Sequence, residues 1–185
     1  IDNRAIISIA LHNIKGDNIA IAVDTTLVTS PRYEEDILWY IPRETPDKWL
    51  AIAPRKAVET NFANNRLEAS AQAGGFLMAY GTAEECRDNI LAFRSEGEEW
   101  LNARQERMNH LVMVANPMKS NLDSLDRAIA WLLLTTDELV TQQQGRGIYA
   151  GLPWFNEYWG RDMFISMPGA TLINGEFEVT REILS

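Results

Sequence analysis

The sequence is poor in the residues that build disulfides, metal sites and membrane spans. Its 185 residues include a single cysteine, Cys86, which excludes a disulfide within the chain, and only two histidines, His12 and His110. Soft metal ions are usually held by several cysteines and histidines, so we expect no metal site. No apolar run approaches the roughly 18–20 residues that span a bilayer. A partner in the membrane is therefore not expected either.

Positively charged residues are fewer than negatively charged ones. The chain has 17 Lys and Arg against 26 Asp and Glu, a net charge of −9. Nucleic acids and anionic membranes are bound through basic surface, so both are excluded as expected partners, and a neutral or cationic ligand fits better. Hydrophobic residues make up 46% of the chain. That fraction is enough to bury a core in one domain or two small ones.

Aromatic residues are concentrated in one segment, residues 149–164. It holds six of the chain's 17 aromatic residues around the adjacent pair Arg161-Asp162, namely Tyr149, Trp154, Phe155, Tyr158, Trp159 and Phe164. Rings offer flat apolar faces, while a guanidinium and a carboxylate place hydrogen bonds at fixed angles. A sugar has C–H faces and a rim of hydroxyls, so this combination suits a pyranose better than a phosphate, a metal ion or a base. The alternative is an aromatic mini-core under a long loop with a local ion pair.

The first 81 residues read as β structure. Alternating apolar residues predict a hairpin of Ile6–Ile14 with 19–23, closed by a turn at Lys15–Asn18. A second pair is predicted at 58–62 and 67–71 around Asn64-Asn65, with short strands near Ile37–Ile41 and Phe76–Tyr80. An antiparallel sandwich, or part of one, fits these strands. For Trp39 and Trp49, interior packing is favoured over contact with a ligand.

Helical signals begin at Thr82-Ala-Glu-Glu85, which has the spacing of a capping box. A charged helix is expected from there to about His110, with Gly97 as an interruption and His110 in a structural role. The clusters Glu96–Glu99 and Arg104–Arg107 are expected to form a solvated face. Asn116-Pro117 then marks a break.

Two further helices are expected after the break. Ser120–Asp123 has capping-box spacing before an apolar periodicity that runs to Val140 and ends in Gln142–Gly147. Asp162 is placed to cap a helix over Met163–Ile173, bent at Pro168 and stopped at Asn174-Gly175. This helix is apolar nearly all round, and another begins at Glu176.

Several of these motifs together resemble one family, the glycogen debranching enzymes. The resemblance rests on Ala150-Gly151, Trp154-Phe155, Trp159-Gly-Arg-Asp162, Phe164–Gly169 and Asn174–Leu184. It is to their amylo-α-1,6-glucosidase domain, a member of the glucoamylase-like (α/α)6-barrel glycosidases. It is strong over 120–185 and loose before that. One position departs from the family, which usually has an acid where this chain has Tyr158; Glu157 lies one residue earlier.

The resemblance implies an α+β multidomain fragment. Residues 1–81 would be the C-terminal part of an N-terminal β-sandwich domain, 82–115 a helical linker, and 116–185 the truncated start of an (α/α)6 barrel. The ends of the sequence agree with this expectation. Ile1–Leu11 is strand-like from its first residues, and the helix over Glu176–Ser185 stops after about two turns. The remainder of the same polypeptide is then an expected partner.

The resemblance also implies roles for five residues. Asp162 and Arg161 would grip sugar hydroxyls far from the scissile bond in the −1 subsite, with Trp159 beside the ring and Trp154 and Phe155 lining the pocket. The alternative for Asp162 is a purely structural helix cap. Glycoside hydrolysis needs two carboxyl groups, roughly 6.5–9.5 Å apart in an inverting enzyme. In this inverting family they come from later barrel loops, so both are expected beyond Ser185.

The implied activity is hydrolysis of branch-point glucose from an α-glucan, glycogen or limit dextrin, by a cytoplasmic α-1,6-glucosidase. The resemblance implies no cofactor, and the 185-residue chain by itself is expected to be inactive. Two alternatives stay open. One is another exo-α-glycosidase of the same clan, glucoamylase- or trehalase-like, and the other is a non-catalytic carbohydrate-binding module.

Overall fold

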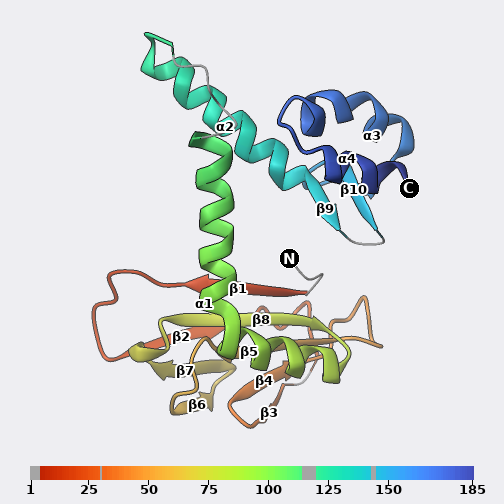
Figure 1. Cartoon of the computed structure of the whole chain (residues 1–185). Helices are drawn as coiled ribbons and strands as arrows, with labels where there is room; N and C mark the ends of the chain where they lie inside the picture. Colours follow the sequence, from red (N-terminus) through yellow and green to blue (C-terminus); the bar gives the residue numbers. More distant parts are fainter. Residues whose placement is uncertain (1–4, 30, 114–119, 143–144) are drawn as a thin grey trace. The chain divides into compact units, whose positions relative to one another are not determined.

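The computed structural model describes residues 5–29, 31–113, 120–142 and 145–185 (Figure 1). The chain divides into two compact units, Ile1–Trp100 and Leu101–Ser185. It is a mixed α+β chain in which antiparallel sheets are followed by helices. The break expected at Asn116-Pro117 lies outside the described residues, and the division into three domains stays a prediction.

Two antiparallel sheets form most of the first unit. One has the strand order β1-β8-β5-β4-β3 and the other the order β2-β7-β6. The strands are β1 (Ile6–Ala10), β2 (Asn18–Ala22), β3 (Arg32–Glu34), β4 (Ile37–Tyr40), β5 (Trp49–Pro54), β6 (Thr60–Ala63), β7 (Arg66–Ser70) and β8 (Gly75–Gly81). The turn predicted at Asn64-Asn65 is confirmed, because it joins β6 to β7 and both asparagines have positive φ angles, as this turn requires.

The predicted first hairpin is wrong. β1 pairs with β8, from Ile6 opposite Ala79 to Ala10 opposite Gly75, whereas β2 pairs with β7 in the other sheet. The link between β1 and β2 therefore passes from one sheet to the other. β1 pairs with one edge of β8, and the other edge of β8 pairs with β5. An unpaired edge on an apolar strand is unfavourable, and these two pairings leave β8 with no unpaired edge.

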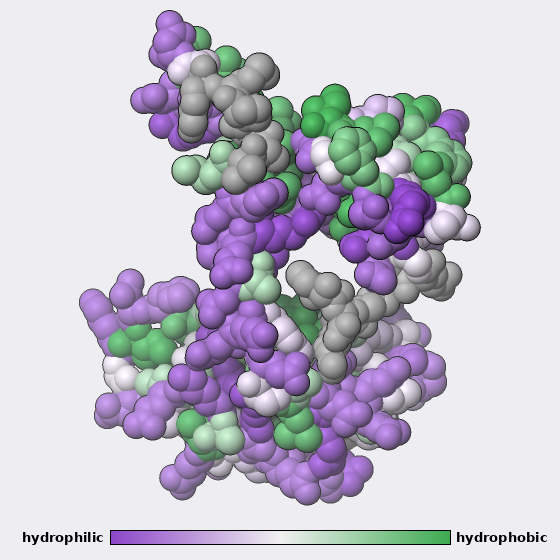
Figure 2. All heavy atoms as spheres, in the orientation of Figure 1, coloured by the Kyte–Doolittle hydropathy of each residue, from purple (hydrophilic) through white to green (hydrophobic). Residues whose placement is uncertain are grey.

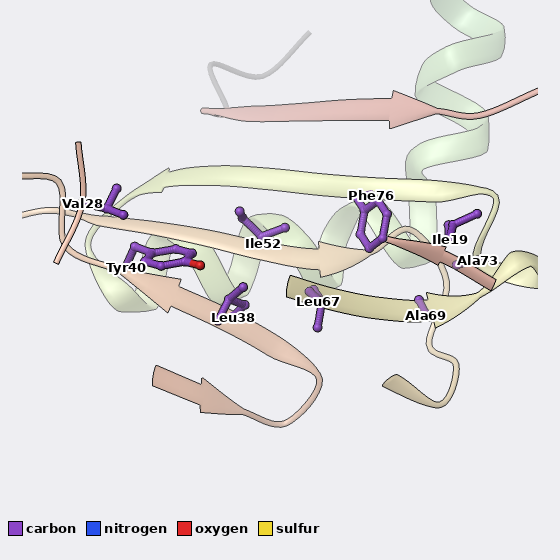
Figure 3. Packing of buried hydrophobic residues seen from close by; sticks show 9 residues of the cluster. All are labelled: Ile19, Val28, Leu38, Tyr40, Ile52, Leu67, Ala69, Ala73 and Phe76. Carbon is purple, nitrogen blue, oxygen red and sulfur yellow. The ribbon is translucent and has the colours of Figure 1, made fainter. Parts of the chain in front are cut away.

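The two sheets share one hydrophobic core. Figure 3 shows its side chains between strands of the two sheets: Ile19, Val28, Leu38, Tyr40, Ile52, Leu67, Ala69, Ala73 and Phe76. The hydroxyl of Tyr40 is not left unpaired by this burial, since it donates to Asn65 Oδ1 at 2.7 Å. The packing places a small sheet against one face of the larger one. Membership in a larger sandwich domain stays a prediction.

The opposite face of the larger sheet is covered by the N-terminal part of helix α1 (Ala83–Met113). Alternate residues of β4, β5 and β8 pack there against Cys86 and Ile90. The capping box is confirmed, because Thr82 N–H donates to Glu85 and Glu85 N–H donates to Thr82 Oγ. Gly97 does not interrupt the helix. A Cβ at Gly97 would lie 2.7 Å from the ring of Phe93, so the glycine makes room for that ring.

Trp39 and Trp49 meet edge to face, with ring centroids 6.0 Å apart. Trp39 is buried between the larger sheet and α1, and Trp49 is half-buried beside it. Interior packing, the role predicted for both, is confirmed.

The second unit contains the rest of the chain. After the C-terminal part of α1 come α2 (Asp123–Leu139), β9 (Val140–Gln142), β10 (Arg146–Gly151), β11 (Phe155–Tyr158), α3 (Gly160–Met167), a π-helical turn (Pro168–Leu172) and α4 (Phe177–Leu184). The small sheet of β9, β10 and β11 was not predicted. Its core is Ile148, Met167 and Ala170, with Leu139, Val140, Met163 and Ile183 around it.

The prediction of a second capping box at Ser120–Asp123 is wrong. The residue that precedes α2 is Leu122, which is extended and has no side chain to cap with. Asp126 instead reaches back from the first turn and accepts from Ser120 N–H at 2.9 Å. The bend expected at Pro168 stays a prediction. The α-helix ends at Met167 and hydrogen bonding changes there to the wider π pattern, with Ile173 N–H donating to Pro168 O at 3.1 Å.

A charged cluster joins three segments of the second unit. Asp137 of α2 accepts from Arg104 and Arg107 of α1, each at 2.5 Å, and its own side chain is only 6% exposed. Arg107 also contacts Glu176, just before α4, at 3.3 Å. The arginines expected on a solvated face are therefore half-buried partners of an acid. Burial lowers the pKa of Arg107, but Asp137 and Glu176 outweigh it and the pKa is raised. His110 was expected to have a structural role, but it is exposed.

The second unit exposes many large apolar side chains. Figure 2 shows hydrophobic surface, in green, gathered over the region of α3 and α4. The exposed large apolar residues of α3, the π-helical turn, the residue after it and α4 include Phe164, Ile165, Leu172, Ile173, Phe177 and Leu184. On α2, Trp131 and Leu132 are exposed as well. Among the described residues, no helix is both long and apolar enough to cross a membrane.

Candidate functional site

A pocket of about 270 Å³ opens where β10, β11 and α3 meet. Its lining consists of Ala150, Phe155, Trp159, Arg161 and Asp162. Four of these are residues singled out from the sequence. The structure thus brings together Phe155, Trp159 and the Arg161-Asp162 pair.

The local backbone explains how these side chains come to share a pocket. β10 and β11 pair with Tyr149 opposite Tyr158 and Gly151 opposite Phe155, with a shift in register between the two pairs. Helix α3 begins at Gly160, so only Trp159 separates strand from helix. Trp159 is extended and its carbonyl accepts from Met163 N–H at 2.9 Å. The first residue of β11, Phe155, and the start of α3 therefore lie within a few residues of each other in the chain and line one pocket.

The expected capping role of Asp162 is wrong. The helix starts three residues earlier than predicted, and the capping position is held by Trp159, without a side-chain cap. Asp162 lies in the first helical turn, where a negative charge is favoured by the helix dipole. Its nearest charged partner is Arg161, with Nε 3.7 Å from Oδ2. The carboxylate is therefore not occupied by backbone N–H groups of its own helix, as the structural alternative required.

The aromatic residues of this segment do not form a closed core. Trp159 is 52% exposed and Phe155 60% exposed, and the Arg161 side chain is 81% exposed. Trp154 is 83% exposed but is not among the residues that line the pocket. A contribution of Trp154 to binding stays a prediction.

Tyr158 occupies the position where the resembling family usually has an acid. Its ring lies against Gly147, where a Cβ would come within 2.5 Å of it, and its hydroxyl lies 3.1 Å from Thr141 Oγ1. The ring of Tyr149 is 5.7 Å away. Tyr158 therefore holds β11 onto β9 and β10. The acid one residue earlier, Glu157, is exposed and is not part of the lining.

The lining can bind a polar ring but carries one acid only. Asp162 is the single carboxylate among the lining residues, whereas glycoside hydrolysis uses two. No group of three or more His, Cys, Asp or Glu suited to a metal ion occurs in the part of the chain that the structure describes. Sequence reasoning missed Ala150, whose place in the lining would have followed from pairing β10 with β11.

Comparison with known proteins agrees with the region of strongest resemblance. Residues 109–185 match the family model described as amylo-alpha-1,6-glucosidase. No curated protein and no solved structure matches the chain significantly. The matched region contains α2, the three-stranded sheet, α3, α4 and the whole of the pocket. Over these residues the chain is similar to the glucosidase domain of debranching enzymes.

Proposed function

We propose that residues 109–185 form part of the sugar-binding site of a debranching-type α-1,6-glucosidase that acts on glycogen or limit dextrin. The observation that carries the proposal is the pocket of Phe155, Trp159, Arg161 and Asp162 inside the region that matches the glucosidase family. The glucosyl unit at the non-reducing end of a branch would occupy this pocket.

The chemistry of the lining supports a neutral sugar. Trp159 offers a flat, half-exposed indole face on which the C–H side of a pyranose packs. The Asp162 carboxylate accepts hydrogen bonds from vicinal hydroxyls, and the Arg161 guanidinium donates to the same rim. Opposite charges on adjacent residues leave the lining close to neutral, which disfavours an anionic ligand.

Catalysis in this proposal is inverting attack of water on the glycosidic carbon, with acid and base carboxylates that residues 1–185 do not supply. Asp162 then binds hydroxyls and takes no part in proton transfer. The exposed apolar side chains of α2 and α3 support the further proposal that these helices pack against other helices of an (α/α)6 barrel. Because the lining holds a single acid, a non-catalytic carbohydrate-binding module is the second candidate.

The test measures sugar binding by the 185-residue chain and its variants. Titration calorimetry with isomaltose, which has the α-1,6 linkage, and maltose, which has the α-1,4 linkage, should give saturable binding of both, because both carry the non-reducing glucosyl unit that the pocket is proposed to hold. Asp162→Asn removes the charge that strengthens its hydrogen bonds, worth roughly 1.5–3 kcal/mol. The affinity should therefore fall at least about tenfold, at 1.4 kcal/mol per decade.

Trp159→Ala separates a binding residue from a packing residue. Since the indole is half exposed, its loss should weaken isomaltose binding and leave the melting temperature nearly unchanged. Trp131→Ala is the matched control, because that indole is also exposed and lies outside the pocket. A loss of stability of about 3–5 kcal/mol with unchanged sugar affinity would refute the proposal. Glucose release from limit dextrin by the chain alone would refute the placement of the acid and base.

A further inference from the structure

A second pocket, of about 210 Å³, lies in the first unit between the end of β5 and the middle of α1. One water needs only about 10–15 Å³ of space measured in this way, so the pocket has room for a small solute. Its lining is Arg55, Lys56, Phe93, Arg94, Ser95 and Glu98. Three cations and one acid thus face a single hollow in a chain whose net charge is −9.

Arg55 is a half-buried cation. In the part of the chain that the structure describes, its buried Nε has no hydrogen-bond partner, and its Nη1 reaches only Gly74 O, at 3.5 Å. No carboxylate of the described residues forms an ion pair with it. The ring of Phe93 lies 5.8 Å from the guanidinium carbon and shields one face from water. A guanidinium that has lost part of its hydration and gained no anion is costly, so binding an anion here is favoured.

Arg94 makes the floor of this pocket rigid. It donates to Pro54 O at 3.0 Å and to Asp36 Oδ2 at 2.6 Å, and its side chain is 14% exposed. Asp36 compensates its charge, so Arg94 is mainly a positioning residue for the end of β5. Since Arg55 follows Pro54 directly, this anchor also fixes where the Arg55 side chain starts.

Lys56 adds a flexible cation at the mouth. It is exposed, and within the described part of the chain it makes no ion pair. Glu98 lies one helical turn after Arg94 and is the only acid in the lining. It makes no ion pair with Arg55 or Lys56, so no acid among the described residues compensates these two cations.

From these contacts we propose that the pocket binds the phosphate group of a small molecule. Arg55 provides donors from its Nη groups, Lys56 an ammonium, and the two approach from adjacent positions of the chain, which suits an oxyanion with several acceptor oxygens. The apolar ring of Phe93 offers a surface for the body of a phosphate ester. A nucleic acid is disfavoured, because the surrounding chain is acidic.

The experiment titrates the 185-residue chain with inorganic phosphate and follows backbone amide resonances, with sodium chloride at equal ionic strength as the reference. Saturable shifts confined to residues around 55–57 and 93–98 are expected. Arg55→Gln should lower the affinity at least about tenfold and Lys56→Gln about threefold. Glu98→Gln should raise it about twofold, because it removes a repelling charge.

The variants are expected to change the phosphate affinity in opposite directions, which misfolding of the chain would not do. Lys15→Gln is the matched control for Lys56→Gln, since it removes an exposed lysine outside the pocket and should leave the affinity unchanged. A parallel titration with glucose 6-phosphate identifies the source of the phosphate group: tighter binding than inorganic phosphate assigns a sugar ester, and equal or weaker binding assigns the free ion. Shifts that chloride reproduces, or that Arg55→Gln and Glu98→Gln leave unchanged, would overturn the proposal.

Discussion

The charged cluster around Asp137 yields the sharpest stability prediction. Asp137→Asn keeps the size of the side chain but removes the charge that holds Arg104 and Arg107 at 2.5 Å. Breaking a fully buried pair costs about 3–5 kcal/mol. The arginine side chains are 30% and 40% exposed here, so water recovers part of the loss, and we expect about 2–3 kcal/mol.

Amide hydrogen exchange is the suitable assay, because it reports each unit of the chain separately. Slow amides of α2 and α4 should exchange roughly 30- to 150-fold faster in Asp137→Asn, at 1.4 kcal/mol per decade. Amides of β5 and β8, in the other unit, should keep their rates. They serve as an internal reference for conditions that affect the whole chain.

Glu138→Gln is the control, since it removes the same charge from an exposed neighbour on the same helix. Its effect should stay within about 0.5 kcal/mol. Combining Asp137→Asn with Arg107→Gln should destabilise by less than the sum of the single changes, with a coupling of about 1–2 kcal/mol. Equal effects of Asp137→Asn and Glu138→Gln would show that the cluster does not stabilise the unit and would refute this reasoning.

Two further predictions concern close packing. Gly147→Ala places a methyl group 2.5 Å from the Tyr158 ring and should destabilise the second unit by about 1–3 kcal/mol. Gly169→Ala is the control, because a Cβ there would meet nothing within 4 Å and should not destabilise the unit. Thermal melts of the two variants measure the difference. Burial, and then Glu85, raises the pKa of the Cys86 thiol to about 11, so at pH 8 a thiol reagent should label it only when α1 opens. Rapid labelling of the native chain would contradict that second prediction.

Local patterns in the sequence identified most elements but not always their partners. The Asn64-Asn65 turn and the Thr82 cap were predictable because each is decided within a few residues. The pairing of β1 with β8 joins residues some 70 positions apart, and alternation specifies a strand without specifying its neighbour. The strands β9, β10 and β11 were missed because β9 and β11 are short and the segment is rich in glycine and aromatic residues, as loops often are.

At the candidate site, residue types were easier to infer than geometry. Arg161, Asp162 and Trp159 attracted attention because a charged pair beside large rings suits a sugar. The start of α3 was placed three residues late, since Asp162 looks like a cap and Trp159 does not. No local signal showed that Trp154 would lie apart from the lining while Ala150 would join it.

The two-sided burial of the central strands has an evolutionary consequence. Along β4, Leu38 and Tyr40 pack toward the sheet of β2, β7 and β6, whereas Ile37 and Trp39 pack toward α1. Residues of β5 and β8 alternate in the same way. Each strand thus carries two interleaved sets of residues under separate selection. Among homologous sequences, odd positions of β4 should co-vary with Cys86 and Ile90 of the helix, and even positions with β2 and β7. Either layer could then diverge while the other is conserved.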